Sequence, residues 1–289
     1  MHAAAAAVKT SGQNRSQTAS LDRGVRRAPR PRKAAGAAPR TYMAMPLIAY
    51  ANPSRFLALT ERVLPWLVGA TAIAFGIGLY QAFWVAPEDY QQGETVRIMF
   101  IHVPAAWLGM VCWTIMSVSA LGTLVWRHPL ADVALKTAAP LGAAFTFVCL
   151  VTGSLWGRPM WGTYWVWDAR LTSVLVLFLM YLGLIALWRT MEDPTRAGRA
   201  AAILTLVGAV NLPIIKFSVE WWNTLHQKAS VLRLGGPSID PAILVPLLTM
   251  AMAFTLLFVT LHAAAMRNEI LRRRVRTLRL RQAQAAQGA

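Results

Sequence analysis

Apolar residues in this chain gather in six long runs that are separated by short polar connections. A helix needs about 20 mostly apolar residues to cross the hydrocarbon core of a bilayer, and each run approaches that length. No run alternates in polarity as the strands of a membrane barrel do, so we predict an all-α polytopic membrane protein. The six predicted helices cover approximately residues 64–85, 102–126, 137–155, 171–188, 200–217 and 242–266.

Composition supports this assignment to the membrane class. Of the 289 residues, 56% are hydrophobic and 14% are charged, whereas a soluble domain usually has about 25% charged residues. The formal net charge of +17 would favour a nucleic-acid partner in a soluble protein, but here the basic residues fall at the two ends and in short connections. We therefore expect membrane lipid, and no nucleic acid, beside these charges.

The two ends of the chain are basic and show no apolar period. Residues 1–52 are rich in Ala, Arg and Pro, and we predict a disordered tail there. A membrane domain over residues 53–266 follows, and then a basic C-terminal tail over residues 267–289.

Lysine and arginine are distributed unevenly between the two sides of the predicted membrane domain. If both termini are cytoplasmic, most of these residues lie inside, as the positive-inside rule requires. Only six then lie outside, namely Arg97, Arg158, Arg170, Lys216, Lys228 and Arg233. We therefore predict cytoplasmic termini.

The external connection over residues 156–170 is unusually rich in tryptophan. Trp and Tyr gather at bilayer interfaces without any ligand, but one or two rings at each helix end satisfy that role. This connection holds four tryptophans, and the next external connection adds two more; they are Trp156, Trp161, Trp165, Trp167, Trp221 and Trp222. Because the spacing Trp165-x-Trp167 would place both rings on one side of an extended segment, we predict an aromatic platform for a planar ligand.

Two histidines belong to the same external side. His102 lies at the mouth of the second predicted helix, and His226 lies in the third external connection. A single histidine in a loop is more often solvated or hydrogen-bonded than a ligand. Two of them on one side of the membrane, with the aromatic platform between them in sequence, favour an axial pair for a haem iron.

A haem also carries two propionates, which need cationic or hydrogen-bonding partners. Arg97 and Arg170 are the predicted partners, because they lie near His102 and the tryptophan-rich segment in the sequence. An acidic side chain would repel propionates. We therefore assign Asp168 to holding the loop, through Arg170, indole N–H groups or backbone donors.

The residues Trp161-Gly-Thr-Tyr-Trp-Val-Trp-Asp168 match the signature W-G-x-x-W-x-W-D. In this respect the chain resembles the tryptophan-rich (WWD) haem-handling proteins of bacterial cytochrome c maturation. The likeness extends over residues 53–266, and the flanking stretches, such as Arg97–Trp107 and Ser218–Gln227, resemble the haem-exporter branch of that family.

The resemblance implies a specific role and setting. It implies haem b held at the periplasmic face of the bacterial inner membrane, with His102 and His226 as axial ligands and the WWD loop, residues 156–170, as platform. It further implies delivery to the haem chaperone CcmE, with the small subunit CcmD and the ABC transporter of CcmA and CcmB as partners. Such a chain binds and transfers haem, and its sequence shows no nucleophile–base pair or P-loop typical of an enzyme.

Three alternatives stay open at this stage. A haem-b subunit of a membrane oxidoreductase would place its histidines at membrane depth on facing helices. A transporter without a cofactor would show ionisable residues along a route through the bilayer, and the predicted helices have almost none. The synthetase-type members of the WWD family are usually longer, with more helices and more histidines.

Overall fold

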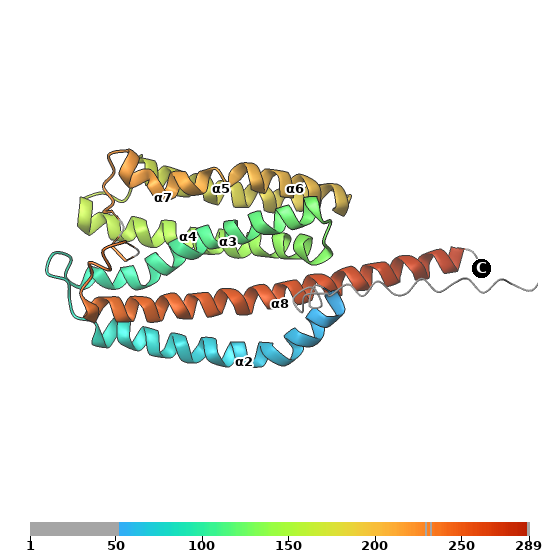
Figure 1. The fold of residues 1–289 in the computed structure, drawn as a ribbon, viewed down its shortest axis with the longest axis horizontal. Helices are drawn as coiled ribbons and strands as arrows, with labels where there is room; N and C mark the ends of the chain where they lie inside the picture. The colour runs from blue at the N-terminus through green and yellow to red at the C-terminus, as the bar shows by residue number, and fades with distance from the viewer. Residues whose placement is uncertain (1–51, 229, 232, 288–289) are drawn as a thin grey trace, which may run out of the picture. The chain divides into compact units, whose positions relative to one another are not determined.

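The structure is a computed structural model that describes residues 52–228, 230–231 and 233–287, which form a helical bundle (Figure 1). Except for Asn52, the predicted N-terminal tail lies outside these residues. The elements in order are α2 (Pro53–Tyr80), the π-helix η1 (Gln81–Val85), the 3-10 helix η2 (Glu94–Ile98), α3 (Met99–Val125), α4 (Pro129–Trp161), α5 (Ala169–Thr190), α6 (Pro194–Gly208), α7 (Asn211–Trp221) and α8 (Pro241–Gln287).

Six stretches of the described chain are helical, long and apolar enough to cross a membrane. The first stretch joins α2 to η1, the second joins η2 to α3, and the fifth joins α6 to α7. The six stretches are Pro53–Val85, Glu94–Val125, Pro129–Trp161, Ala169–Thr190, Pro194–Trp221 and Pro241–Gln287. The prediction of an all-α protein with six spanning helices is thus confirmed. The orientation of these helices across a bilayer stays a prediction.

Several helices extend beyond the apolar runs that predicted them. The end of α4 includes Trp156–Trp161, so the tryptophan-rich connection narrows to residues 162–168. The basic segment after residue 266 continues as helix to Gln287 within α8 (Figure 1). A run of arginines is compatible with helix, since Arg is among the stronger helix formers.

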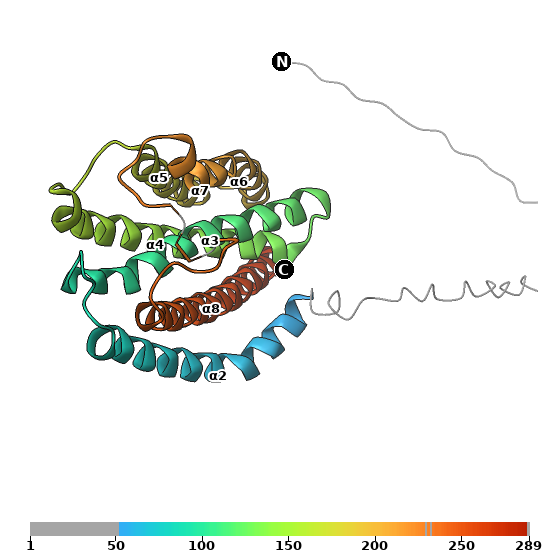
Figure 2. The same cartoon turned by 60° about the vertical axis from the view of Figure 1, so that its left-hand side comes forward.

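The helices α3 and α4 pack against each other along most of their lengths, at the centre of the described fold (Figures 1 and 2). On one side of them lie α5, α6 and α7, and on the other lies α8, which in turn packs against α2. Trp113 of α3 is buried between these helices; its indole contacts the Tyr181 ring and donates to the Thr205 carbonyl at 3.1 Å. These contacts hold α3, α5 and α6 at fixed rotations about their own axes.

Side-chain caps set where two of the helices begin. Asp168 precedes α5, and its Oδ1 accepts from the backbone N–H of Leu171 at 2.7 Å. Asp193 precedes α6 and caps the N–H of Thr195 at 2.8 Å. At the other end of the tryptophan-rich connection, α4 stops at Gly162, whose φ of +74° lies in the left-handed region that favours glycine.

An ionic network joins α8 to α4 at the ends farthest from that connection. Glu269 is almost completely buried and contacts Lys136 at 3.1 Å and Arg272 at 2.6 Å. Arg273 contacts both Glu269, at 2.9 Å, and Asp132, at 2.6 Å. The carboxylate of Glu269 is therefore surrounded by cations, which offsets the cost of its burial.

Candidate functional site

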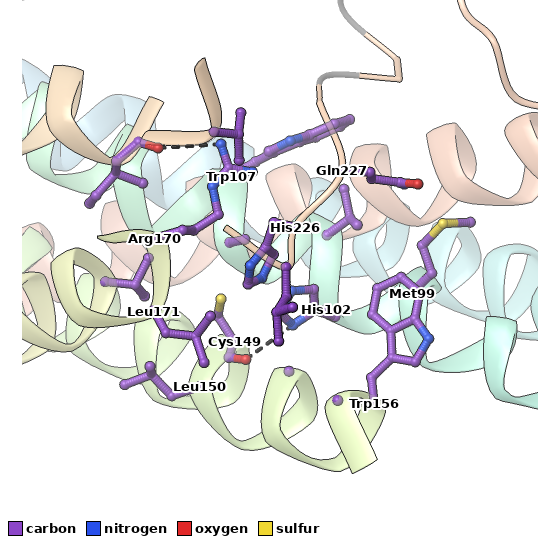
Figure 3. Close-up of a pocket in the computed structure, with 18 of the residues that line it drawn as sticks. Met99, His102, Trp107, Cys149, Leu150, Trp156, Arg170, Leu171, His226 and Gln227 are labelled. Carbon is purple, nitrogen blue, oxygen red and sulfur yellow. Dashed lines mark hydrogen bonds between the residues drawn. The ribbon is translucent and has the colours of Figure 1, made fainter. Parts of the chain in front are cut away.

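A cavity of about 390 Å³ lies at the end of the bundle where the tryptophan-rich connection meets the chain that follows α7. Its wall is made by α3, α4, α5, α7 and the first turns of α8, together with Gln92, Trp165 and residues of the α7–α8 connection. Both His102 and His226 line it, although 124 positions separate them in the sequence (Figure 3). Its volume lies within the range of about 300–1,000 Å³ that is typical of small-molecule sites.

The ring of His102 is held through one of its two nitrogens. His102 lies in the first turns of α3, and its Nδ1 is 3.0 Å from the carbonyl oxygen of Cys149 on α4 (Figure 3). A carbonyl can only accept, so Nδ1 carries the proton and donates it there. The Oγ1 of Thr152, which itself donates to the Val148 carbonyl at 2.6 Å, accepts at 3.1 Å from the same nitrogen. The neutral ring therefore keeps its lone pair on Nε2, the arrangement that a metal-binding imidazole needs.

Two neighbours on α4 fix the position of the His102 ring. Trp156 meets it edge to face, with ring centroids 5.6 Å apart, and the Trp156 indole donates to the side-chain oxygen of Gln92 at 3.0 Å. Gly153 lies so close that a Cβ built on it would stand 2.7 Å from Cε1 of His102. Glycine is thus required at this point for the ring to lie where it does.

The ring of His226, which comes from a distant part of the sequence, is also held through its Nδ1 nitrogen. It lies in the connection after α7, its Nδ1 is 3.4 Å from Oδ2 of Asp168, and its ring meets that of Trp161 at 4.8 Å. Burial lowers the pKa of His226 below its ordinary value, and the Asp168 carboxylate opposes this shift. The neutral ring donates from Nδ1 to the carboxylate and keeps the lone pair on Nε2.

Asp168 ties together the two segments that carry the site. One carboxylate oxygen caps α5 through Leu171, and the other accepts from the backbone N–H of Leu225 at 3.4 Å and from His226. Its side chain is only 8% exposed. The sequence indicated a residue that holds the loop through backbone donors, and two of the contacts of Asp168 are of that kind.

The tryptophans divide into two groups. Trp156, Trp161 and Trp165 line the cavity, as does Trp107 of α3 (Figure 3), and the indole Nε1 of Trp165 is buried without a hydrogen-bond partner among the described residues. Trp167 is 76% exposed and does not line the cavity, although its ring meets that of Trp165 edge to face. Of the two rings that the sequence assigned to the platform, only that of Trp165 therefore belongs to the cavity wall.

Trp221 and Trp222, at the end of α7, lie outside the cavity wall. Both are more than half exposed, and their rings contact each other edge to face. Trp221 also stacks on Phe217 one turn earlier in the helix, with ring centroids 5.3 Å apart. The structure places this pair beside the site and not in its wall.

The two arginines that the sequence assigned to the propionates also differ in position. Arg170 lines the cavity and donates to the Ser218 hydroxyl at 3.2 Å and to the carbonyls of Ile215 and Lys216 at 3.3 Å. Arg97 does not line it. Its guanidinium pairs with Glu94 and donates to the carbonyls of Ala82 and Phe83 at the end of the first span, so it ties η2 to that span.

The sequence did not single out several residues that prove to shape the site. Cys149, Thr152 and Gly153 form one turn of α4 against His102, and Gln92 orients Trp156. Lys216 and Lys228 line the cavity as well. The sequence signal for the α4 residues was weak, because it consists of a Thr-Gly-Ser run within an apolar helix. The meaning of that run becomes clear only from its contact with His102 on α3.

The described residues suit a haem. Two histidines each present a free Nε2 lone pair, four tryptophans give flat apolar contacts, and the cavity also offers an unpaired indole N–H and cationic side chains. Nitrogen ligands whose second nitrogen is anchored on an oxygen acceptor are the usual arrangement at metal centres. The fold and the site together define a polytopic membrane protein with a paired-histidine, aromatic cavity at one end of its helices.

Comparison with known proteins gives the family. The family profile described as Heme exporter protein C (CcmC) matches residues 46–281. The chain is 75% identical to Heme exporter protein C of Bradyrhizobium diazoefficiens over 83% of this chain and 90% of that protein, and 51% identical to the Escherichia coli K12 protein of the same name over 76% and 89%. A putative cytochrome c biosynthesis ccmC-like mitochondrial protein of Marchantia polymorpha is 44% identical over 73% and 89%. The chain belongs to the heme exporter protein C family.

Proposed function

We propose that this chain binds haem b in the cavity and delivers it to the periplasmic haem chaperone CcmE during the maturation of c-type cytochromes. The observation that carries the proposal is the anchoring of both histidines. Nδ1 of His102 donates to Cys149 and Nδ1 of His226 faces Asp168, so each ring keeps Nε2 for the iron. The names of the relatives, which concern haem export and cytochrome c biosynthesis, support the same role.

The proposed setting is the inner membrane of a bacterium, with the cavity on the periplasmic side. The excess of Lys and Arg on the opposite side of the six spans supports this orientation. The proposed partners are the small subunit CcmD and an ABC transporter formed by CcmA and CcmB, in keeping with the exporter name of the family.

The work of this chain's own residues is to bind, orient and present the ligand. His102 and His226 would hold the iron, while Trp156, Trp161 and Trp165 would offer apolar ring surface to the ligand. When bound, haem supplies the iron and the reactive periphery, and the acceptor side chain belongs to the chaperone. The two histidines would hold the iron, and their donor strength would help to set its potential.

The position of the histidines favours this role over that of an electron-transfer subunit. His102 lies in the first turns of α3, and His226 lies in a connection outside the spans. A haem held there is near the loops, where a soluble partner can reach it.

The proposal is tested by haem loading of the chaperone in cells. A bacterial strain that lacks its own gene for this protein is complemented with the wild-type chain, or with the double variant His102→Ala, His226→Ala, and membranes are stained for covalent haem on CcmE. We expect loading with the wild-type chain and none with the double variant at equal membrane levels. Equal loading with the empty vector would contradict the proposal.

A further inference from the structure

The cavity is charged at one end and apolar at the other. Its charged wall residues all lie on α5 or α7 or in the α7–α8 connection; they are Arg170, Lys216, Glu220 and Lys228. The wall deeper in the bundle is apolar and includes Met110, Val174, Leu177 and Leu247. Along α3 the wall runs from Met99 to Met110, which is about 16 Å at 1.5 Å per residue. A ligand that fills this cavity must itself be amphipathic, with an anionic edge toward the α7–α8 connection.

Two of the three cations are free to meet such an edge. The hydrogen bonds and ion pairs within the described chain engage neither the Nζ of Lys216 nor that of Lys228, and both residues are exposed. Lys228 follows His226 by two residues, and the carbonyl of Lys216 accepts from Arg170. Both lysines therefore lie on segments that also carry residues of the site.

The two arginines near the site are already engaged by acceptors within the protein, which leaves pairing with an anionic ligand edge to the lysines. Arg97 is bound to Glu94 and to backbone carbonyls away from the cavity, and Arg170 already donates to the Ser218 hydroxyl and to two carbonyls of α7. A third donor without a partner in the described chain, Nε1 of Trp165, belongs to the same cavity wall. A buried N–H without an acceptor is costly, and an acceptor on the ligand would remove that cost.

We infer that Lys216 and Lys228 form a carboxylate-recognition rim, which selects a tetrapyrrole that carries free carboxylates and turns that edge toward the α7–α8 connection. The inference rests on the proposed function. Glu220 is the single acidic side chain among the described wall residues, so the rim keeps a net positive charge. A lysine ammonium acts on a carboxylate as a mobile point charge, which suits an exposed rim better than a buried clamp.

The experiment compares two ligands that differ only at the two carboxylates, which are charged in one and are neutral methyl esters in the other. Purified wild-type protein in detergent is titrated with haem and with haem dimethyl ester, and the same titrations are made for Lys216→Gln, Lys228→Gln and the double variant. Arg233→Gln is the matched control, because Arg233 is an exposed cation of the same connection that does not line the cavity.

We expect wild-type protein to bind the ester about tenfold more weakly than haem, with that difference shrinking at high salt. The double variant should bind haem about tenfold more weakly and should bind haem and ester alike, while the control behaves as wild type. Equal binding of haem and ester by wild type, or a double variant indistinguishable from it, would overturn the rim. A wild-type protein that takes up neither compound would overturn the proposed function and the rim with it.

Discussion

Nδ1 of His102 lies 3.0 Å from the carbonyl oxygen of Cys149, so a residue at the start of one span is oriented by the backbone of the next. This contact fixes both the tautomer and the direction of the ring. It depends on Gly153, one turn later in α4, because any larger side chain would occupy the space of the imidazole.

Substitution of Gly153 should therefore weaken haem binding without unfolding the bundle. A Cβ at this position would stand 2.7 Å from Cε1 of His102, so Gly153→Ala must displace the ring from its acceptor. We expect about tenfold weaker haem binding, as for other losses of an orienting contact at a metal ligand. The measurement is a haem titration followed by absorbance, alongside Gly76→Ala, where a Cβ meets open space. If the two variants bind haem equally, the packing argument fails.

Asp168 should matter more for the site than for the start of its helix. Asp168→Asn keeps an oxygen for the cap but removes the charge that faces His226, and we expect about tenfold weaker haem binding. Asp168→Ala should also cost about 1 kcal/mol of stability, because the cap is lost. Asp193→Asn and Asp193→Ala provide the control, since Asp193 caps α6 and, unlike Asp168, makes no contact with His226. Thermal unfolding and haem titration separate the two effects, and a pattern shared by both positions would argue against a role in the site.

Haem binding should persist at a lower pH than an ordinary histidine allows. Burial lowers the pKa of His226, so its neutral, metal-binding form is kept as the pH falls through about 6.5 and is lost only at a lower pH. Arg170 also lowers this pKa, whereas Asp168 raises it. We expect the plot of haem affinity against pH, measured in the His102→Ala background, to bend below 6.5. In the same background, Asp168→Asn should move the bend lower still. A bend at or above 6.5 would contradict the burial of the ring.

Glu269 should stabilise the fold without affecting the ligand. Glu269→Gln leaves Lys136 and Arg272 without their carboxylate partner in the described chain, and leaves Arg273 with Asp132 alone. We expect a loss on the order of 2 kcal/mol, seen as a lower midpoint of thermal unfolding. The haem spectrum should not change, because the network does not line the cavity. Glu192→Gln is the control, since Glu192 is exposed; equal midpoints for the two variants would show that the network contributes nothing.

Much of the fold could be predicted because apolar run length alone identifies a spanning helix. The six spans, and the expectation that His102 and His226 lie at the same end of them, followed from that pattern, and both histidines do line one cavity. Rotation about a helix axis could not be predicted in the same way. Arg97 and His102 are five residues apart in one helical stretch, yet only the second faces the cavity, because Glu94 and the end of the first span engage the arginine.

The tryptophan-rich connection was a second limit on what could be predicted from the sequence. Alternation along the sequence predicts which side chains share a side of a segment, but not which of them line a cavity: Trp165 lines it and Trp167 is exposed, although the two rings contact each other. The role of Gly153 was hidden for a different reason. A glycine in an apolar helix has many explanations, and only its contact with a ring on α3 reveals the one that applies.

The most direct test of the account is the optical spectrum of the protein purified from haem-replete membranes, with His102→Ala and His226→Ala beside it. The account predicts a wild-type spectrum typical of two axial histidines, and a shift or loss of haem in each single variant. His262→Ala is the matched control, because that ring contacts the Ala134 carbonyl and does not line the cavity. Wild-type protein free of haem, or single variants of residues 102 and 226 with the wild-type spectrum, would contradict it.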